Sequence, residues 1–222
     1  MTMKIRREYS MVVNHKRIYR IMRSAGLKSV CRRKRKTYIP SSQEITAENI
    51  LNRDFNSSNI HEKWLTDVTE FKYGDGKKAY LSAILDLGDK SIISYVIGKS
   101  NNNALVFETF DKAVENYPDA KPIFHRDRGF QYTNRIFKNK LDEAGMIQSM
   151  SRVGRCIDNG PMEGFWGILK TEMYHLKRFA DYETLKLAIQ EYLNYYNTGR
   201  YQKRLNSMTP LEYRNYVLKS VA

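Results

Sequence analysis

Three carboxylates occupy positions from which they could hold metal ions. Asp67 lies in the middle of the apolar run WLTDVTEF, Asp127 follows a short apolar run in HRDRGFQY, and Glu163 lies in the first turn of a predicted helix. An uncompensated carboxylate is costly inside a core strand, so Asp67 indicates a functional position. Mg²⁺ prefers oxygen ligands, usually a few carboxylates together with water and substrate phosphates. Three carboxylates are therefore sufficient protein ligands for two Mg²⁺ ions that assist an in-line displacement at phosphorus.

Each carboxylate also has an ordinary structural explanation. Asp67 could lie on an edge strand and pair with a nearby lysine, and Asp127 could pair with an adjacent arginine in a surface turn. Glu163, just after Pro161, is equally typical of an acid that stabilises the start of a helix. No single acid is decisive. The hypothesis depends on three motifs in this order, with 35 residues between Asp127 and Glu163.

Lys170 adds to this set of residues. It follows Glu163 by seven residues and is therefore expected on the same face of the helix. Gly167 lies between them, where the lack of a side chain would let a DNA backbone approach closely. Lys170 could then bind a phosphate, although an ordinary solvated lysine explains the residue as well.

The positive charge of the chain is concentrated at its beginning. Residues 1–40 hold 13 Lys or Arg and one acid, so they carry +12 of the net charge of +14. A nearly neutral body with a basic arm favours a polyanionic partner, most often nucleic acid, with a solvated tail or an arm for anionic lipid as alternatives. The predicted DNA contacts of the arm are a run of cations: Arg32, Arg33, Lys34, Arg35 and Lys36.

The composition excludes several other classes of protein. A hydrophobic fraction of 41% and an aromatic fraction of 12% are typical of a globular chain rather than a disordered one. No apolar run reaches the roughly 18 residues that a membrane span needs, and the basic N-terminus holds no signal sequence. The two cysteines, Cys31 and Cys156, lie far apart and are expected to be free thiols in a reducing cytoplasm.

The predicted elements that carry the three acids are a mixture of strands and helices. Short apolar runs separated by turn signals indicate three antiparallel strands, and helical spacing of apolar residues indicates the helices that follow. Strands are expected at 64–71, 78–86, 91–97, 121–125 and 146–150, and helices at 102–117, 133–144 and 161–176. Periodicity alone supports only a mixed α/β domain. The order of the elements, however, resembles the ribonuclease-H-like fold of integrase cores, a mixed five-stranded sheet with flanking helices.

Smaller segments flank this core. An N-terminal helix is predicted to begin after Asn14 and to end near Gly26. C-terminal helices are predicted at 181–196 and from Thr209, which with Glu212 suits a capping box. The predicted organisation is a basic helical segment at 1–40, a linker at 41–61, the catalytic core at 62–176 and a helical extension at 177–222.

Four ordered motifs resemble the transposases of bacterial insertion sequences that are encoded in two overlapping frames, a family within the retroviral-integrase superfamily. The motifs are WLTDVTEF, HRDRGFQY, SMSRVGRCIDNGPMEGFWGILKTEMY and YYNTGRYQKRLNSMTPLEYR. The N-terminal HKRIYRIMRSAGL is also similar to the family's helix-turn-helix segment, so the resemblance covers nearly the whole chain. It implies that Asp67, Asp127 and Glu163 are the catalytic acids. It also implies a phosphate-binding role for Lys170.

The resemblance implies a DNA transposase that cleaves and joins DNA strands, a polynucleotidyl transferase with two Mg²⁺ or Mn²⁺ ions in each active site. Its expected partners are the DNA ends of the element, target DNA and further copies of the chain in a homo-oligomer. Recognition of the ends is expected to lie mainly with the product of the partner frame, or with a fusion to it. The expected location is the bacterial cytoplasm, without a membrane partner.

Five further residues near the acids are expected to affect the shape or the charge of the site. Asp158 and Asn159 match a family signature and are expected to shape the loop before the third core helix rather than to bind metal. Arg126 stands where the family commonly has Ser or Thr, so it would either repel the metal ions or bind the scissile phosphate. Gly160 and Gly164 stand where Ala and Ser are frequent, and they would loosen the start of the helix.

Two other functions remain as alternatives at this point. Because the chain begins within the helix-turn-helix region, it could be a truncated, catalytically impaired remnant that only binds DNA. A ribonuclease-H-like nuclease that acts in repair or on RNA–DNA hybrids is the other hypothesis, which the C-terminal motif and the basic arm disfavour.

Overall fold

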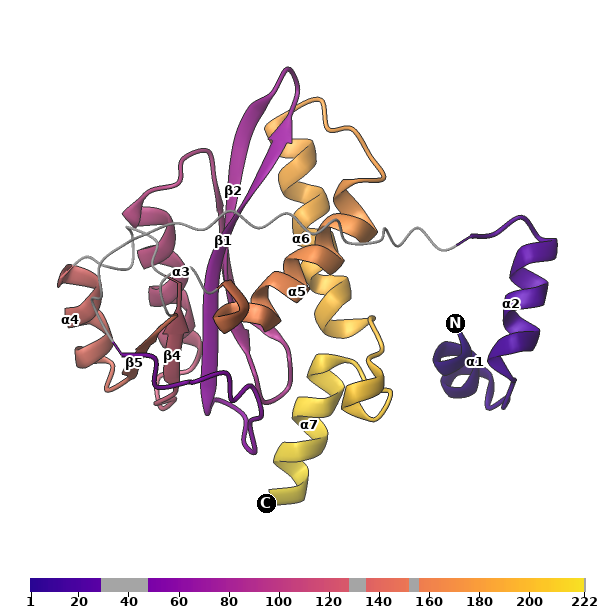
Figure 1. Cartoon of the computed structure of the whole chain (residues 1–222), viewed down its shortest axis with the longest axis horizontal. Coiled ribbons are helices and arrows are strands. Elements are labelled where there is room, and N and C mark those ends of the chain that lie inside the picture. The colour runs from indigo at the N-terminus through magenta and orange to yellow at the C-terminus, as the bar shows by residue number, and fades with distance from the viewer. Residues whose placement is uncertain (29–47, 128–134, 152–155, 222) are drawn as a thin grey trace.

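A five-stranded mixed sheet forms the centre of the protein in the computed structural model, which describes residues 1–28, 48–127, 135–151 and 156–221 (Figure 1). Its order is β3-β2-β1-β4-β5, in which β1 to β3 are antiparallel and β4 and β5 run parallel to β1. The strands are β1 (Lys63–Tyr73), β2 (Lys77–Asp86), β3 (Ile92–Gly98), β4 (Ile123–Arg126) and β5 (Ile147–Met150). The predicted ribonuclease-H-like sheet is therefore confirmed.

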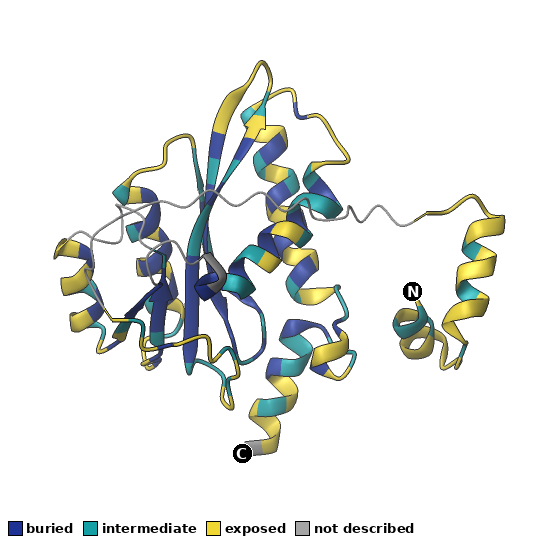
Figure 2. Cartoon of the chain, in the orientation of Figure 1, coloured by how far each residue is buried: buried dark blue, intermediate teal, exposed yellow. Residues whose placement is uncertain are grey.

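Helices cover both faces of this sheet. Helices α3 (Asn103–Asn116) and α4 (Arg135–Glu143) lie on one face, and α5 (Gly160–Leu169) and α6 (Tyr182–Thr198) lie on the other (Figure 1). Successive side chains of a strand point to opposite faces, so β1 contributes to both layers. Trp64 packs in the cluster with α3, and Leu65 packs in the cluster with α5. Buried residues accordingly line the sheet on both sides (Figure 2).

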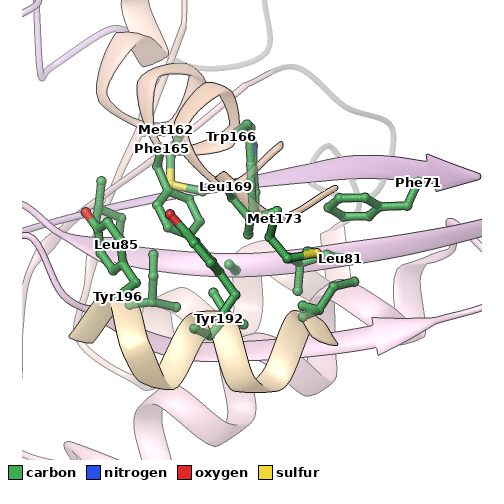
Figure 3. Packing of buried hydrophobic residues seen from close by; sticks show 14 of the residues in the cluster. Phe71, Leu81, Leu85, Met162, Phe165, Trp166, Leu169, Met173, Tyr192 and Tyr196 are labelled. Atoms are coloured by element: carbon green, nitrogen blue, oxygen red, sulfur yellow. The ribbon is translucent and has the colours of Figure 1, made fainter. Parts of the chain in front are cut away.

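The layer under α5 and α6 is rich in large apolar side chains. The predicted inward residues of both helices are buried, which confirms their helical spacing (Figure 3). In α5 and the turn after it these residues are Met162, Phe165, Trp166, Leu169 and Met173, and in α6 they are Leu185, Ile189, Tyr192, Leu193 and Tyr196. This packing fixes the position of α5, and with it Glu163, across β1.

The periodicity of the third core helix predicted a regular helix to residue 176, but the helix does not continue regularly that far. It changes at Lys170 to a π-helical turn, Lys170–Tyr174, closed by a hydrogen bond from His175 N–H to the Lys170 carbonyl. The wider turn brings the Tyr174 hydroxyl to β1, where it bonds both the N–H and the carbonyl of Lys72 at 2.8 Å. A π-helical turn holds one residue more than an α-helical turn. Regular apolar spacing cannot reveal it, since the contact that accompanies it here is with a distant strand.

The C-terminal helix α7 (Pro210–Val221) begins at the predicted capping box, which is confirmed. Glu212 accepts from the Thr209 N–H at 2.9 Å, and the Thr209 hydroxyl accepts from the Glu212 N–H at 3.3 Å. Arg214 then joins α7 to the turn between β2 and β3, where it donates to the buried Asp89 carboxylate and to the Ser91 hydroxyl. This buried ion pair fastens the end of the chain to the sheet.

The N-terminal segment contains two helices rather than the single one predicted. The first, α1 (Thr2–Tyr9), was not expected, and the second, α2 (His15–Ser24), begins at Asn14, whose side chain accepts from the Lys16 N–H as predicted. The apolar residues of α2 do not pack inward, since Ile21 is 54% exposed and neither helix has a buried residue among those described. The cation run at 32–36 and Cys31 lie outside the described residues.

Within the described parts of the chain, every helix is too short or too polar to cross a membrane.

Candidate active site

Two of the three carboxylates stand side by side where β4 ends next to the middle of β1. In the parallel pairing of β1 with β4, Thr66 lies opposite Arg126; Asp67 is the next residue of β1, and Asp127 directly follows β4. Ligands usually bind beyond the carboxyl ends of parallel strands, which is where Asp127 lies. β1 is the central strand of five, so the alternative that Asp67 lies on an edge strand is wrong.

Two hydrogen bonds hold the Asp67 carboxylate. Trp166 Nε1 donates to Oδ2 at 2.9 Å, and the Val68 N–H donates to Oδ1 at 2.8 Å. Trp166 comes from α5, one turn after Glu163, so this bond joins the helix of the third acid directly to the first. Trp166 was not among the residues predicted for the site. The one available signal was that a buried tryptophan needs an acceptor.

Glu163 lies in the first turn of α5 and is half-buried. The start of this helix is tied to β1 beside Asp67, because Asn159 Nδ2 donates to the Thr66 carbonyl at 3.1 Å. Pro161 at the beginning of the helix lacks an N–H that would have no intrahelical partner. The first turn of α5, with Glu163, therefore begins beside the middle of β1, where β4 ends.

The electrostatics of Asp67 shows that the three acids are close enough to interact. The pKa of Asp67 is raised to about 7, chiefly by burial and then by the negative charges of Asp127 and Glu163, against the two hydrogen bonds that lower it. Like charges gathered at a half-buried site disfavour ionisation of one another. A bound divalent cation would relieve this repulsion, and the all-oxygen donor set suits Mg²⁺ or Mn²⁺.

The side chains do not yet enclose an ion. Within the described residues, no group of three His, Cys, Asp or Glu side chains is arranged to hold a metal ion by itself. Asp127 also borders residues 128–134, which lie outside the description. The donor set and its mutual repulsion fit a divalent cation, and the remaining ligands would be water and DNA phosphate, as is usual for Mg²⁺.

Lys170 lies near the acids, at the first residue of the π-helical turn. Its ammonium group stands over the Phe71 ring, with Nζ 5.3 Å from the ring centroid. Burial lowers the pKa of Lys170, while the Asp67 and Glu70 carboxylates raise it. The lysine therefore contributes positive charge beside the carboxylates, where a DNA phosphate would also be attracted.

Arg126 is placed differently from a surface arginine. It is 2% exposed, and its guanidinium faces the Gln148 amide on the neighbouring strand β5. This arrangement leaves a DNA phosphate little access to Arg126. Gly160 and Gly164 both lie within α5, so neither glycine interrupts the helix that carries Glu163. A Cβ at Gly164 would meet no atom within 4 Å.

Comparison with known protein families identifies two kinds of domain in the chain. Residues 58–156 and residues 163–218 each match a family described as an integrase core domain. Residues 1–35 match an HTH-like domain, in agreement with the two N-terminal helices.

Curated relatives resemble the whole chain. An uncharacterized transposase-like protein of Haemophilus influenzae is 42% identical over 218 residues, which cover 98% of this chain and 100% of the relative. The putative transposase InsK for insertion sequence element IS150 of Escherichia coli is 40% identical over 215 residues, covering 96% of this chain and 75% of the relative.

Solved structures agree with the fold. The catalytic core domain of HTLV-2 integrase in complex with magnesium superposes with a TM-score of 0.57 at 20% identity, covering 71% of this chain and 98% of that one. A chain of the simian T-cell lymphotropic virus intasome, in complex with PP2A regulatory subunit B56 gamma, gives a TM-score of 0.62 at 19% identity, covering 78% and 60%. At these identities the likeness concerns the fold alone.

Proposed function

Since this chain belongs to the insertion-sequence transposases that contain an integrase core, we propose that Asp67, Asp127 and Glu163 hold divalent metal ions in its active site. The observation that carries the proposal is geometric: Asp67 and Asp127 lie side by side where β4 ends next to β1, and the bond from Trp166 to Asp67 ties in the helix that carries Glu163. When bound, two Mg²⁺ or Mn²⁺ ions would activate the attacking oxygen and stabilise the leaving oxygen during phosphodiester transfer.

The other residues of the site prepare the carboxylates for this task. Trp166 and the Val68 N–H each hold one oxygen of the Asp67 carboxylate and so fix its orientation. Lys170 binds a DNA phosphate beside the acids, because a cation there offsets the charge that DNA brings. Arg126 acts mainly through its contact with Gln148 and supports the end of β4.

DNA is the substrate of the reaction and contacts more of the chain than the three acids. Residues 1–35 match an HTH-like domain, and we propose that the cations Arg32, Arg33, Lys34, Arg35 and Lys36 contact the phosphate backbone. Two DNA ends must be held together for transposition, so the active form is a homo-oligomer. A partner-frame protein, or a fusion with it, recognises the ends of the element.

A strand-transfer assay tests the proposed site. A labelled, pre-cut duplex with the terminal sequence of the element is incubated with target plasmid and Mg²⁺ or Mn²⁺, and wild type is compared with Glu163→Gln. Glu163→Gln keeps the size of the side chain but removes its charge. Joined product from the wild type, absent from the variant and without metal, would support the proposal. Metal-independent joining, or equal joining by the variant, would overturn it.

The same assay separates the alternative functions. Binding of the duplex without joining, by wild type and by a fusion with the partner-frame protein, would favour the catalytically impaired remnant. Hydrolysis of the strand without transfer to the target would favour a nuclease.

A further inference from the structure

A short segment before the sheet packs against the beginning of α5. We call residues 48–55 the strap; they lie within the predicted linker, 41–61, and outside the residues matched as HTH-like or integrase core domains. The strap makes a tight turn at Asn52 and Arg53, whose φ angles are 42° and 63°. Left-handed backbone at two successive residues other than glycine is unfavourable, so the surrounding contacts must enforce the turn.

The strap is anchored on the core by its own backbone and by one apolar side chain. The Leu51 side chain is 2% exposed and belongs to the cluster of α5 and α6. The Leu51 N–H donates to the Ser149 hydroxyl at 2.9 Å, and the Met150 N–H donates to the Glu48 carbonyl at 3.1 Å. The strap therefore has a defined position beside β5, although its sequence predicts only a linker.

From this position the strap reaches the buried carboxylate of Asp158. Arg53 Nε donates to Oδ1 at 2.6 Å, and Asn49 Nδ2 donates to Oδ2 at 2.9 Å. The Asp158 side chain is 0% exposed, whereas that of Arg53 is 37% exposed. A buried carboxylate is stable only when it is paired and hydrogen-bonded, so these two donors help to hold Asp158 in place.

Asp158 lies directly beside the machinery of the proposed active site. It belongs to the 3₁₀ turn Cys156–Asn159 that leads into α5, and the next residue, Asn159, bonds the Thr66 carbonyl beside Asp67. Phe55 of the strap packs against the same helix start, with its Cε2 atom 3.9 Å from the position of a Cβ at Gly160. Glu163 is in the first turn of that helix.

We propose that Arg53 and Asn49 are positioning residues of the transposase, which hold Asp158 and thereby fix the start of α5 and the place of Glu163 relative to Asp67. The inference rests on the proposed function of the three acids. On this inference, the strap supports the active site and sets the position of the third carboxylate, Glu163.

The decisive variant is Arg53→Gln, which removes the positive charge and leaves a shorter side chain that reaches Asp158 less well. Full-length wild type, Arg53→Gln, Arg53→Lys and Asn49→Ala are compared for strand transfer at saturating Mn²⁺, for DNA binding by fluorescence anisotropy, and for amide hydrogen exchange of residues 160–169. A misplacement of about 1 Å costs roughly a hundredfold in rate, so Arg53→Gln is expected to lower the rate by about 10- to 100-fold. DNA affinity should stay within about twofold of wild type, and Arg53→Lys should restore most of the rate.

The matched control is Arg214→Gln, which breaks a second ion pair between an arginine and a buried aspartate, Asp89, in the turn between β2 and β3. It should lower the melting temperature but leave the rate per folded molecule and the exchange of residues 160–169 unchanged. An Arg53→Gln protein with wild-type rate and exchange would overturn the proposal. So would a loss of rate that merely follows the melting temperature equally in both variants.

The design distinguishes this inference from the proposed function. If wild type and Glu163→Gln behave alike in strand transfer, the function of the acids is refuted. The exchange of residues 160–169 in Arg53→Gln would still decide whether the strap positions the helix. Should Arg53→Gln not fold, Asn49→Ala, which loses the donor to Asp158 together with the acceptor of the Asn52 N–H, carries the same test.

Discussion

Removal of the indole N–H of Trp166 offers a sharp test of the site, because it changes one bond to Asp67. Trp166→Phe keeps an aromatic ring in the cluster under α5 but loses the donor 2.9 Å from Asp67 Oδ2. The Asp67 carboxylate would then keep only the Val68 N–H as a donor. We expect its orientation to loosen and its affinity for a divalent cation to fall.

The size of the effect follows from the burial of the bond. A hydrogen bond to a charged group contributes about 1.5–3 kcal/mol, and Trp166 is 7% exposed, so water replaces the donor poorly. A loss of about 2 kcal/mol corresponds to roughly a 30-fold change in an equilibrium constant. Removal of a hydrogen-bond partner of a metal ligand typically costs about 10- to 100-fold in metal affinity or activity, and the expected change lies within this range.

The assay is a Mn²⁺ titration, followed by the paramagnetic signal of free Mn²⁺ and by strand transfer. Trp64→Phe is the matched control, since the chain has only these two tryptophans and Trp64 donates instead to His61 Nδ1, at 3.3 Å. Trp166→Phe should require about 10- to 30-fold more Mn²⁺ than wild type, while Trp64→Phe should lose stability alone. If both variants bind Mn²⁺ as wild type does, the orienting role of Trp166 is refuted.

Three further predictions concern stability. Burial lowers the pKa of Lys90 to about 8, from 10.5, so the unfolded chain binds more protons between these pH values and the unfolding free energy should rise with pH across that window. Lys90→Met should raise the unfolding free energy by about 1–2 kcal/mol at neutral pH and flatten its rise with pH, as measured by urea unfolding. An equal gain at every pH would show that the lowered pKa of Lys90 is not the cause. Tyr174→Phe removes two bonds to the Lys72 backbone and should cost about 1–2 kcal/mol, with faster exchange in the π-helical turn; unchanged exchange would count against it. Thr209→Ala should cost about 1 kcal/mol through the α7 cap, measured by thermal unfolding with Thr184→Ala as control, and a loss that Thr184→Ala equals would argue against the capping box.

The fold was predictable where local periodicity and tertiary packing agree. All five strands and the apolar faces of α3, α5 and α6 follow from spacing, because each element buries one regular set of side chains. The adjacency of Asp67 and Asp127 could not be predicted from apolar spacing, because spacing does not specify the parallel pairing of β1 with β4. Only the resemblance to a known order of elements predicted that pairing.

Other features depend on contacts between distant parts of the chain. The bond of Arg53 to Asp158 joins residues 105 apart, and the bond of Trp166 to Asp67 joins residues 99 apart. Neither partner has a local pattern that distinguishes it from a linker arginine or a core tryptophan. Helix α1 was missed for a different reason, since its sequence TMKIRREY has no buried face and no side-chain cap.

The way in which α7 is fastened has a consequence for the time at which the enzyme matures. Arg214 bonds Ser91 across 123 residues, and β1 pairs with β4 only after the chain between them has been made. Contacts of such long sequence separation form slowly, because loop closure precedes their stabilisation. A ribosome that still holds α7 therefore carries a sheet whose β2–β3 turn has a buried aspartate without its arginine. The bonds of Arg214 to this turn can form only once α7 has left the ribosome.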